Sequence, residues 1–188
     1  MSEKKESILI AATRLFACNG YHAVGVDRII EESAVSKMTF YKYFPSKKDM
    51  MIAVLERRAE DAFTSLANFV KPKRSAMARI RAVFEWHTQW FKDSDFTGCM
   101  FIAATAEYHD LDVDIVAVAT KQKRSLVEFI GQLATDVMPT DQAQKFAARC
   151  VILLDGAIVN AQVLGNRHAA DEAWSIARML LQANGIDA

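Results

Sequence analysis

The sequence predicts an all-α protein. Only 7 glycines and 3 prolines occur in 188 residues, which is few for the many turns of a β-rich fold. Through most of the chain, apolar side chains recur every three to four residues, as they do on one face of a helix. Hydrophobic residues make up 52% of the chain, so a chain of this length can bury a core without disulfides or metal.

Four helices are expected within the first 70 residues. In the first, Ile8, Leu15 and Phe16 share one face, and Gly20 marks the end. The second covers the short segment VDRIIEESAV, residues 26–35, in which apolar and acidic side chains lie on opposite sides. Both segments are therefore amphipathic and should pack on a common core.

The third and fourth helices follow closely. The segment KMTFYKYF, residues 37–44, begins after Ser36, whose hydroxyl can accept a hydrogen bond from the amides of a new first turn. Pro45 ends this helix because the residue before a proline is pushed out of the α region. Ser46, three residues before an aspartate, resembles the start of a capping box, and the apolar stripe after it predicts a long helix to about residue 70.

The clearest internal boundary is the segment KPKRS, residues 71–75, where Pro72 interrupts the helical pattern. The chain beyond it predicts five more helices. They cover residues 76–91, 99–108, 112–137, 141–165 and 170–183.

Residues 36–48 form a basic patch in a chain with no net charge, since 23 basic residues balance 23 acidic ones. Two short helices joined by a tight turn, the second of them basic, match the helix-turn-helix arrangement, whose later helix enters the DNA major groove. At about 100° per residue, Phe40 and Phe44 face inward. Residues expected to face base edges are Met38, Thr39 and Lys42, and those expected near phosphates are Lys37, Tyr41, Tyr43, Lys47 and Lys48. Composition alone leaves open a solvated basic face on an ordinary helical bundle.

The runs ILIAATRLFACNGY and VDRIIEESAVSKMTFYKYFPSKKDMMIAVLE resemble the N-terminal domain of the TetR (tetracycline-repressor-like) family. The resemblance covers residues 3–63 and implies a DNA-binding domain there, followed by an effector-binding and dimerisation domain over 72–188. It further implies a homodimer, an inverted-repeat DNA operator and, usually, repression. By position it implies DNA contacts from Lys37, Met38, Thr39, Tyr41, Lys42, Tyr43 and Lys47.

Three positions depart from the family pattern. Gly25 stands where relatives often carry a threonine that caps the second helix, and Ala34 stands in the turn where glycine is common. Met38 replaces a small residue and can either press on a thymine methyl or crowd the groove. These departures keep a second hypothesis open, namely a helical small-molecule-binding or interaction protein whose DNA-binding module is degenerate.

Aromatic side chains gather along the sequence in the expected C-terminal domain. Aromatics at helical spacing most often form core, but the resemblance implies a small-molecule site between these helices. We expect an apolar or aromatic effector, with His87 or Glu107 as a polar anchor. The residues assigned to this pocket are Trp86, His87, Trp90, Phe91, Met100, Phe101 and Glu107.

The helix over residues 141–165 is apolar nearly all round, so part of it is expected to meet a partner chain. The predicted dimer interface lies on the last two helices. Its residues are Gly156, Ala157, Asn160, Ala161, Trp174 and Leu181. The alternative is that these residues fill only the core of one chain.

No catalytic, metal or cofactor site is expected, because the sequence contains no HExxH, GxSxG or phosphate-binding glycine loop. Three widely spaced cysteines in apolar surroundings favour reduced thiols. The apolar run near the N-terminus is too short for a signal peptide, and the segment CVILLDGAIV is too short for a membrane span. We expect a cytoplasmic protein without a membrane partner.

Overall fold

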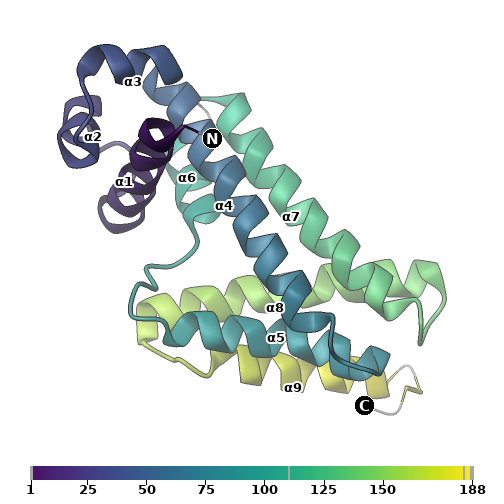
Figure 1. The fold of residues 1–188 in the computed structure, drawn as a ribbon. Helices are drawn as coiled ribbons and strands as arrows, with labels where there is room; N and C mark the ends of the chain where they lie inside the picture. The colour runs from purple at the N-terminus through teal and green to yellow at the C-terminus, as the bar shows by residue number, and fades with distance from the viewer. Residues whose placement is uncertain (1, 110, 184, 187–188) are drawn as a thin grey trace. The chain divides into compact units, whose positions relative to one another are not determined.

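The computed structural model describes residues 2–109, 111–183 and 185–186. This part of the chain contains helices and connecting segments but no strand, so the predicted all-α fold class is confirmed (Figure 1). The helices are α1 (Glu3–Asn19), α2 (Val26–Ser33), α3 (Lys37–Tyr43), α4 (Lys47–Val70), α5 (Ala76–Lys92), α6 (Met100–Tyr108), α7 (Val113–Ala134), α8 (Thr140–Leu164) and α9 (Ala169–Gln182).

The chain folds as two compact units. The first unit comprises Met1–Asp61 and Cys99–Lys121, and the second comprises Ala62–Gly98 and Gln122–Ala188. Helices α4 and α7 each continue from one unit into the other. Helix α6, which we expected in the C-terminal domain, belongs to the first unit together with α1–α3.

Two serine caps fix the starts of α3 and α4, as the sequence predicted. The hydroxyl of Ser36 accepts a hydrogen bond from the N–H of Thr39 at 3.2 Å. At the next helix start, the hydroxyl of Ser46 accepts from the N–H of Asp49 at 3.1 Å and donates to the Asp49 carboxylate at 2.6 Å. Each cap is worth about 1 kcal/mol, because it satisfies a backbone amide that has no partner within the helix.

The turn between α2 and α3 contains a strained residue. Ala34 ends α2 in the left-handed conformation, with φ 52° and ψ 35°. A residue with a Cβ pays about 1–2 kcal/mol there, because the Cβ lies close to the following carbonyl oxygen. At the other end of α2, Gly25 supplies no side-chain cap. The sequence thus departs from the family pattern at both ends of this helix.

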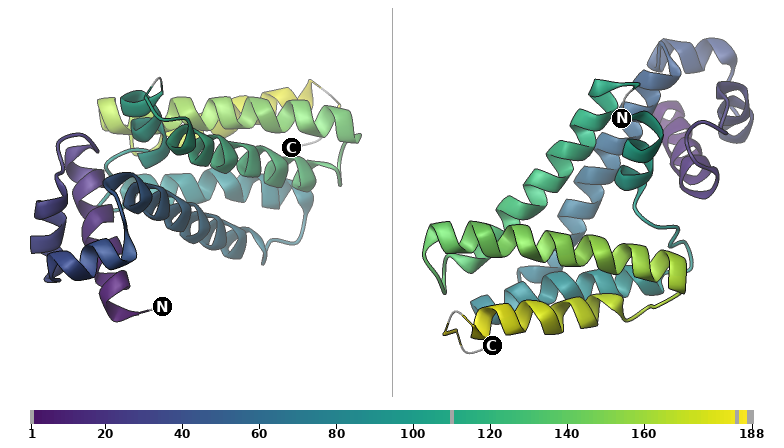
Figure 2. Two further views of the ribbon diagram at one scale, coloured as in Figure 1. Left: turned by 90° about the horizontal axis from the view of Figure 1, so that it is seen from above. Right: turned by 180° about the vertical axis from the view of Figure 1, so that it is seen from behind.

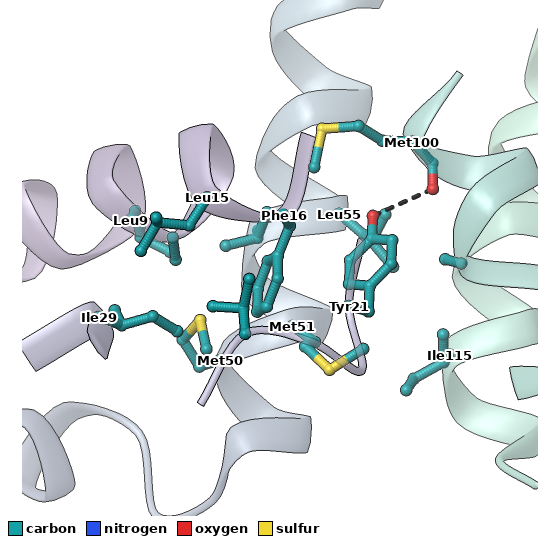
Figure 3. Packing of buried hydrophobic residues seen from close by; sticks show 14 of the residues in the cluster. Leu9, Leu15, Phe16, Tyr21, Ile29, Met50, Met51, Leu55, Met100 and Ile115 are labelled. Atoms are coloured by element: carbon teal, nitrogen blue, oxygen red, sulfur yellow. Dashed lines mark hydrogen bonds between the residues drawn. The ribbon is translucent and has the colours of Figure 1, made fainter. Parts of the chain in front are cut away.

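The core of the first unit surrounds Tyr21, which is fully buried (Figure 3). Its ring stacks on Phe16 with 4.8 Å between centroids, and its hydroxyl donates to the Met100 carbonyl oxygen at 3.0 Å. Met51, Leu55 and Ile115 complete its surroundings (Figure 3). Burial raises the pKa of Tyr21 far above its ordinary value, so the phenol stays protonated and donates to α6.

In the second unit α8 and α9 run antiparallel and pack along their length, and α5 also packs against α9 (Figures 1 and 2). The rings of Phe84 and Trp174 meet between α5 and α9 at 5.5 Å. Cys150 is buried in α8, and burial raises the pKa of its thiol to about 12. This thiol is therefore protonated and unreactive at neutral pH.

By length and composition alone, α8 could cross a membrane, which the sequence-based expectation did not allow. That expectation considered ten residues, whereas the full helix has 25 residues with few charges. The inward face of α8, from Ala143 to Ala161, is buried in the second unit. The core helix of a soluble protein passes the same test of length and composition, and 39% of the candidate span in α8 is buried.

Candidate nucleic-acid interface

Helices α2 and α3 and the turn between them form a helix-turn-helix (Figure 1). Phe40 fixes the inward side of α3 because its side chain is fully buried, and its ring lies 5.9 Å from that of Phe44, which is also buried. Both belong to the core of the first unit. The rotation of α3 is therefore set by two phenylalanines four residues apart, as the sequence predicted.

The opposite side of α3 is exposed. The side chain of Met38 is 83% exposed and that of Tyr41 is 43% exposed. Lys37 and Lys42 are exposed as well, whereas Thr39 is half-buried and its hydroxyl lies 2.9 Å from that of Ser36. The face that the sequence assigned to DNA thus lies in solvent and carries positive charge and apolar surface together.

Two residues on the flanks of α3 have protein partners. The Lys37 ammonium lies 3.2 Å from the Asp27 carboxylate, with both side chains largely exposed. Exposed pairs of this kind contribute about 0–1 kcal/mol, so a phosphate can displace the aspartate. The Tyr43 hydroxyl donates to the Ser2 hydroxyl at 2.9 Å.

Lys47 and Lys48, at the start of α4, are held within the first unit. The Lys47 ammonium donates to the Tyr21 carbonyl oxygen at 2.6 Å, and burial lowers the pKa of Lys47. Lys48 lies 2.9 Å from Asp112 and 2.6 Å from Asp114. Hydrogen bonds to Asp114 and then to Asp112 raise the pKa of Lys48, while its bond lowers the pKa of Asp112. In this conformation both lysines link elements of the protein, unlike the exposed Lys42.

Comparison with known proteins agrees with this geometry. Residues 8–54, which include α2, α3 and the start of α4, match the family profile described as bacterial regulatory proteins, tetR family. A TetR-family transcriptional regulator from Streptomyces coelicolor superposes with a TM-score of 0.89 and 25% identity, over 97% of this chain and 90% of that one.

The N-terminal domain of the chain belongs to the TetR family. TetR-family regulators bind operator DNA, and the matched residues contain the helix-turn-helix of this chain.

Among curated relatives of this TetR-family chain, the activator FasR of Mycolicibacterium smegmatis is 34% identical over 83 residues, which cover 44% of this chain and 38% of FasR. The repressor NemR of Escherichia coli is 24% identical over 132 residues, which cover 69% of this chain and 66% of NemR. The matches thus span less than two thirds of these relatives. The reduced form of NemR shares the fold, with a TM-score of 0.81, 22% identity and coverage of 94% of this chain and 95% of that one.

The seven predicted effector residues are divided between the two units. Met100, Phe101 and Glu107 belong to the first unit, and the other four line α5 in the second. The rings of Trp90 and Phe91 are in contact there, and Phe96 packs against both at 5.1 and 5.2 Å. Sequence reasoning missed Phe96 because it lies in the loop after α5, outside any helical pattern.

His87 is a polar residue in the buried stripe of α5. Its ring is 4% exposed, and its Nδ1 lies 2.8 Å from the Val83 carbonyl oxygen. Burial first, and to a smaller extent the positive charge of Lys123, lower the pKa of His87 to about 4, while the hydrogen bond to Val83 opposes the shift. The imidazole is therefore neutral at pH 7, with Nδ1–H donating to the carbonyl and Nε2 able to accept.

Gln122 occupies a comparable position on α7. It continues the stripe of Ile115, Ala119, Leu126 and Ile130, and its Oε1 is buried without a hydrogen-bond partner among the described residues. Beside it in sequence, Lys123 pairs with Asp155 of α8. A glutamine in an apolar stripe is visible in the sequence, but its missing partner is visible only in the fold.

Glu107, predicted as an effector anchor, is hydrogen-bonded within the first unit. Its carboxylate accepts hydrogen bonds from the N–H groups of Tyr21 at 2.9 Å and His22 at 2.6 Å. The His22 ring stacks on Tyr108 with 4.4 Å between centroids. Gly20 has φ +78°, and a Cβ built on it would lie 3.0 Å from Glu107 Oε1. The carboxylate thus ties α6 to the loop that leads into the helix-turn-helix.

Most of the predicted dimer residues lie inside the second unit. Ala157, Ala161 and Leu181 are buried, and Trp174 is half-buried against Phe84. Gly156 and Asn160 are on the surface, where the Asn160 amide donates to the Gly156 carbonyl oxygen at 2.8 Å. The exposed apolar side chains of the two helices are Ile152, Val159, Val163 and Leu164 on α8, and Ile176 and Met179 on α9.

Proposed function

We propose that this protein is a dimeric, ligand-responsive repressor that binds an inverted-repeat operator through α3. The observation that carries the proposal is the exposed, basic and aromatic face of α3, held in place by the buried Phe40. Lys37 offers sequence-independent attraction to phosphate, and the phenols of Tyr41 and Tyr43 can fix the register on the backbone. Lys42 faces the base edges. Because the net charge is balanced, this attraction comes from the local basic patch at residues 36–48.

Selection of bound fragments from a random-sequence DNA pool at near-physiological salt tests the proposal. We expect an inverted repeat whose half-sites lie about 10 base pairs apart, because a two-fold symmetric dimer presents α3 to successive major grooves. Replacing Tyr41 and Lys42 together by alanine should abolish specific binding without changing helicity or oligomeric state. Undiminished operator affinity in that variant would refute the assignment of the α3 face.

The dimer surface we propose is the exposed apolar stripe of α8, formed by Ile152, Gly156, Val159 and Val163 at spacings of four, three and four residues. Ile152 and Val163 are 70% and 72% exposed in the single chain. Glycine in the middle of this stripe lets a second helix approach closely, so the occupant is a second copy of the same helix.

Val163→Asp tests this surface, since it places a charge where two copies would meet. Analytical ultracentrifugation should show monomers for this variant and dimers for the wild type. Asp141→Ala, at the distant end of α8, provides a matched control that should remain dimeric. A dimeric Val163→Asp variant with unchanged affinity would exclude the stripe.

We also propose that the second unit binds an apolar or aromatic effector near α5. The supporting observations are the half-buried Trp86 and Trp90, the neutral His87 and the unpartnered oxygen of Gln122. An effector can release DNA only if it binds more tightly to a state of the dimer in which the two α3 helices have a different separation. Screening a compound library by thermal shift, and then testing each hit for displacement of labelled operator, tests this effector site. If no compound both shifts the melting temperature and displaces the operator, the result counts against the site.

A second candidate function rests on α2. Gly25 gives that helix no side-chain cap, and Ala34 strains the turn before α3. These two features could have cost the helix-turn-helix its affinity for an operator. The protein would then be a helical small-molecule-binding or interaction protein. Weak binding that is blind to sequence, from a folded dimer, would favour this alternative over the repressor.

We place the protein in the cytoplasm, where its DNA target lies. Fractionation of cells producing a tagged chain should recover it in the soluble fraction, and recovery with membranes would contradict this placement. A reporter driven from a promoter that overlaps the selected operator tests the direction of regulation. Reporter output should rise when the gene for the regulator is deleted, whereas a fall would identify an activator.

A further inference from the structure

The first turn of α3 presents apolar surface, whereas the recognition helix of a DNA-binding protein usually offers hydrogen bonds to base edges there. Met38 is 83% exposed, more than any other large apolar side chain of the described residues. Its thioether has no donor and is only a weak acceptor. An apolar side chain left in water on a binding face gains free energy when a partner covers it.

The polar groups beside Met38 are already engaged. The Thr39 hydroxyl lies 2.9 Å from the Ser36 hydroxyl, which also accepts the Thr39 N–H as the helix cap. The Lys37 ammonium lies on the flank of α3, 3.2 Å from the carboxylate of Asp27, and is assigned to a phosphate rather than to a base edge. Polar contact with base edges therefore falls to Lys42 in the second turn, and the first turn offers mainly the Met38 side chain.

In the major groove, thymine is the base that presents an apolar group, its C5 methyl, whereas the other three bases present donors and acceptors there. We propose that Met38 determines operator sequence by packing against the methyl group of a thymine in each half-site. This inference rests on the DNA-binding function proposed above and adds the chemical group of the operator that α3 recognises.

The expected effect follows from the size of one methyl group. Moving one methyl from water into apolar contact changes a binding constant by a factor of about 4. A symmetric operator contains two such contacts, so removing both methyl groups should weaken binding by about 15-fold.

The experiment uses the full-length protein and the operator obtained from the random pool. Each thymine is replaced, symmetrically in both half-sites, by deoxyuridine, which lacks only the methyl group. Fluorescence anisotropy at fixed salt should show one symmetric pair of positions at which uracil weakens wild-type binding by about 15-fold. In Met38→Ala, the uracil penalty at that pair should disappear.

Two control variants distinguish recognition of the thymine methyl by Met38 from a general loss of DNA affinity. Lys37→Ala should weaken binding to all DNA and keep the uracil penalty, because Lys37 is assigned to a phosphate and a phosphate contact is blind to the base. Met38→Leu should retain the penalty, since leucine is also apolar. Met38 is exposed, so the melting temperature of Met38→Ala should match that of the wild type.

Two results overturn the inference: no uracil position weakens wild-type binding, or the penalty persists unchanged in Met38→Ala. Both would leave operator binding itself intact. A random pool that yields no operator would instead defeat the proposed function, and this inference with it.

Discussion

The buried His87 should make the stability of this protein fall steeply below neutral pH. Its pKa in the folded chain is about 4, against 6.5 for an unperturbed histidine, because the charged ring would lose its hydration. The unfolded chain therefore takes up a proton at a higher pH than the folded chain does. The stability that the neutral ring contributes is complete above pH 6.5 and is lost as the pH falls from about 6.5 to about 4.

The size of this loss follows from the two pKa values. A difference of about 2.5 corresponds to about 3 kcal/mol in the free energy of unfolding, a large share of the 5–15 kcal/mol typical of a domain. Urea denaturation followed by circular dichroism at several pH values between 7.5 and 4.5 measures it.

The matched variant is His87→Asn, whose amide can replace the Nδ1–H donor to the Val83 carbonyl but cannot ionise. Its free energy of unfolding should depend less on pH than that of the wild type, by up to about 3 kcal/mol across the range. An identical pH slope in both proteins, or a His87 ring resonance that titrates near pH 6.5, would refute the reasoning.

Three further predictions concern backbone contacts of the first unit. Ala34→Gly should raise the free energy of unfolding by about 0.5–1 kcal/mol in urea denaturation, because relief of the left-handed strain exceeds the entropy that glycine adds to the unfolded chain; a lower value would mean that the strain is absent. Glu107→Gln should lower it by about 1–2 kcal/mol, since both carboxylate oxygens accept from the Tyr21 and His22 N–H groups and an amide replaces one of them by an NH2 donor; the exposed Glu56→Gln serves as the control. Ser36→Ala should cost about 1 kcal/mol and reduce operator affinity, because the cap of α3 is lost; unchanged affinity would show that α3 does not depend on this cap.

Much of the fold follows from local sequence rules. The caps at Ser36 and Ser46 and the break at Pro45 set the bounds of α3 and the start of α4, and they involve residues within four positions of each other. The inward rotation of α3 follows from the spacing of Phe40 and Phe44. Helical periodicity is a short-range property, so the sequence by itself determined the helices, the helix-turn-helix and the exposed face of α3.

Contacts between distant segments were decided only by the tertiary structure. Glu107 meets the Tyr21 N–H across 86 residues, and Lys48 meets Asp114 across 66, so no pattern within one helix could reveal either partner. The same limit explains why Ala161 was assigned to the dimer face although it is buried in its own unit. Periodicity tells which side of a helix is apolar, but whether that side meets the same chain or another depends on how the helices pack, and that is settled by the whole core.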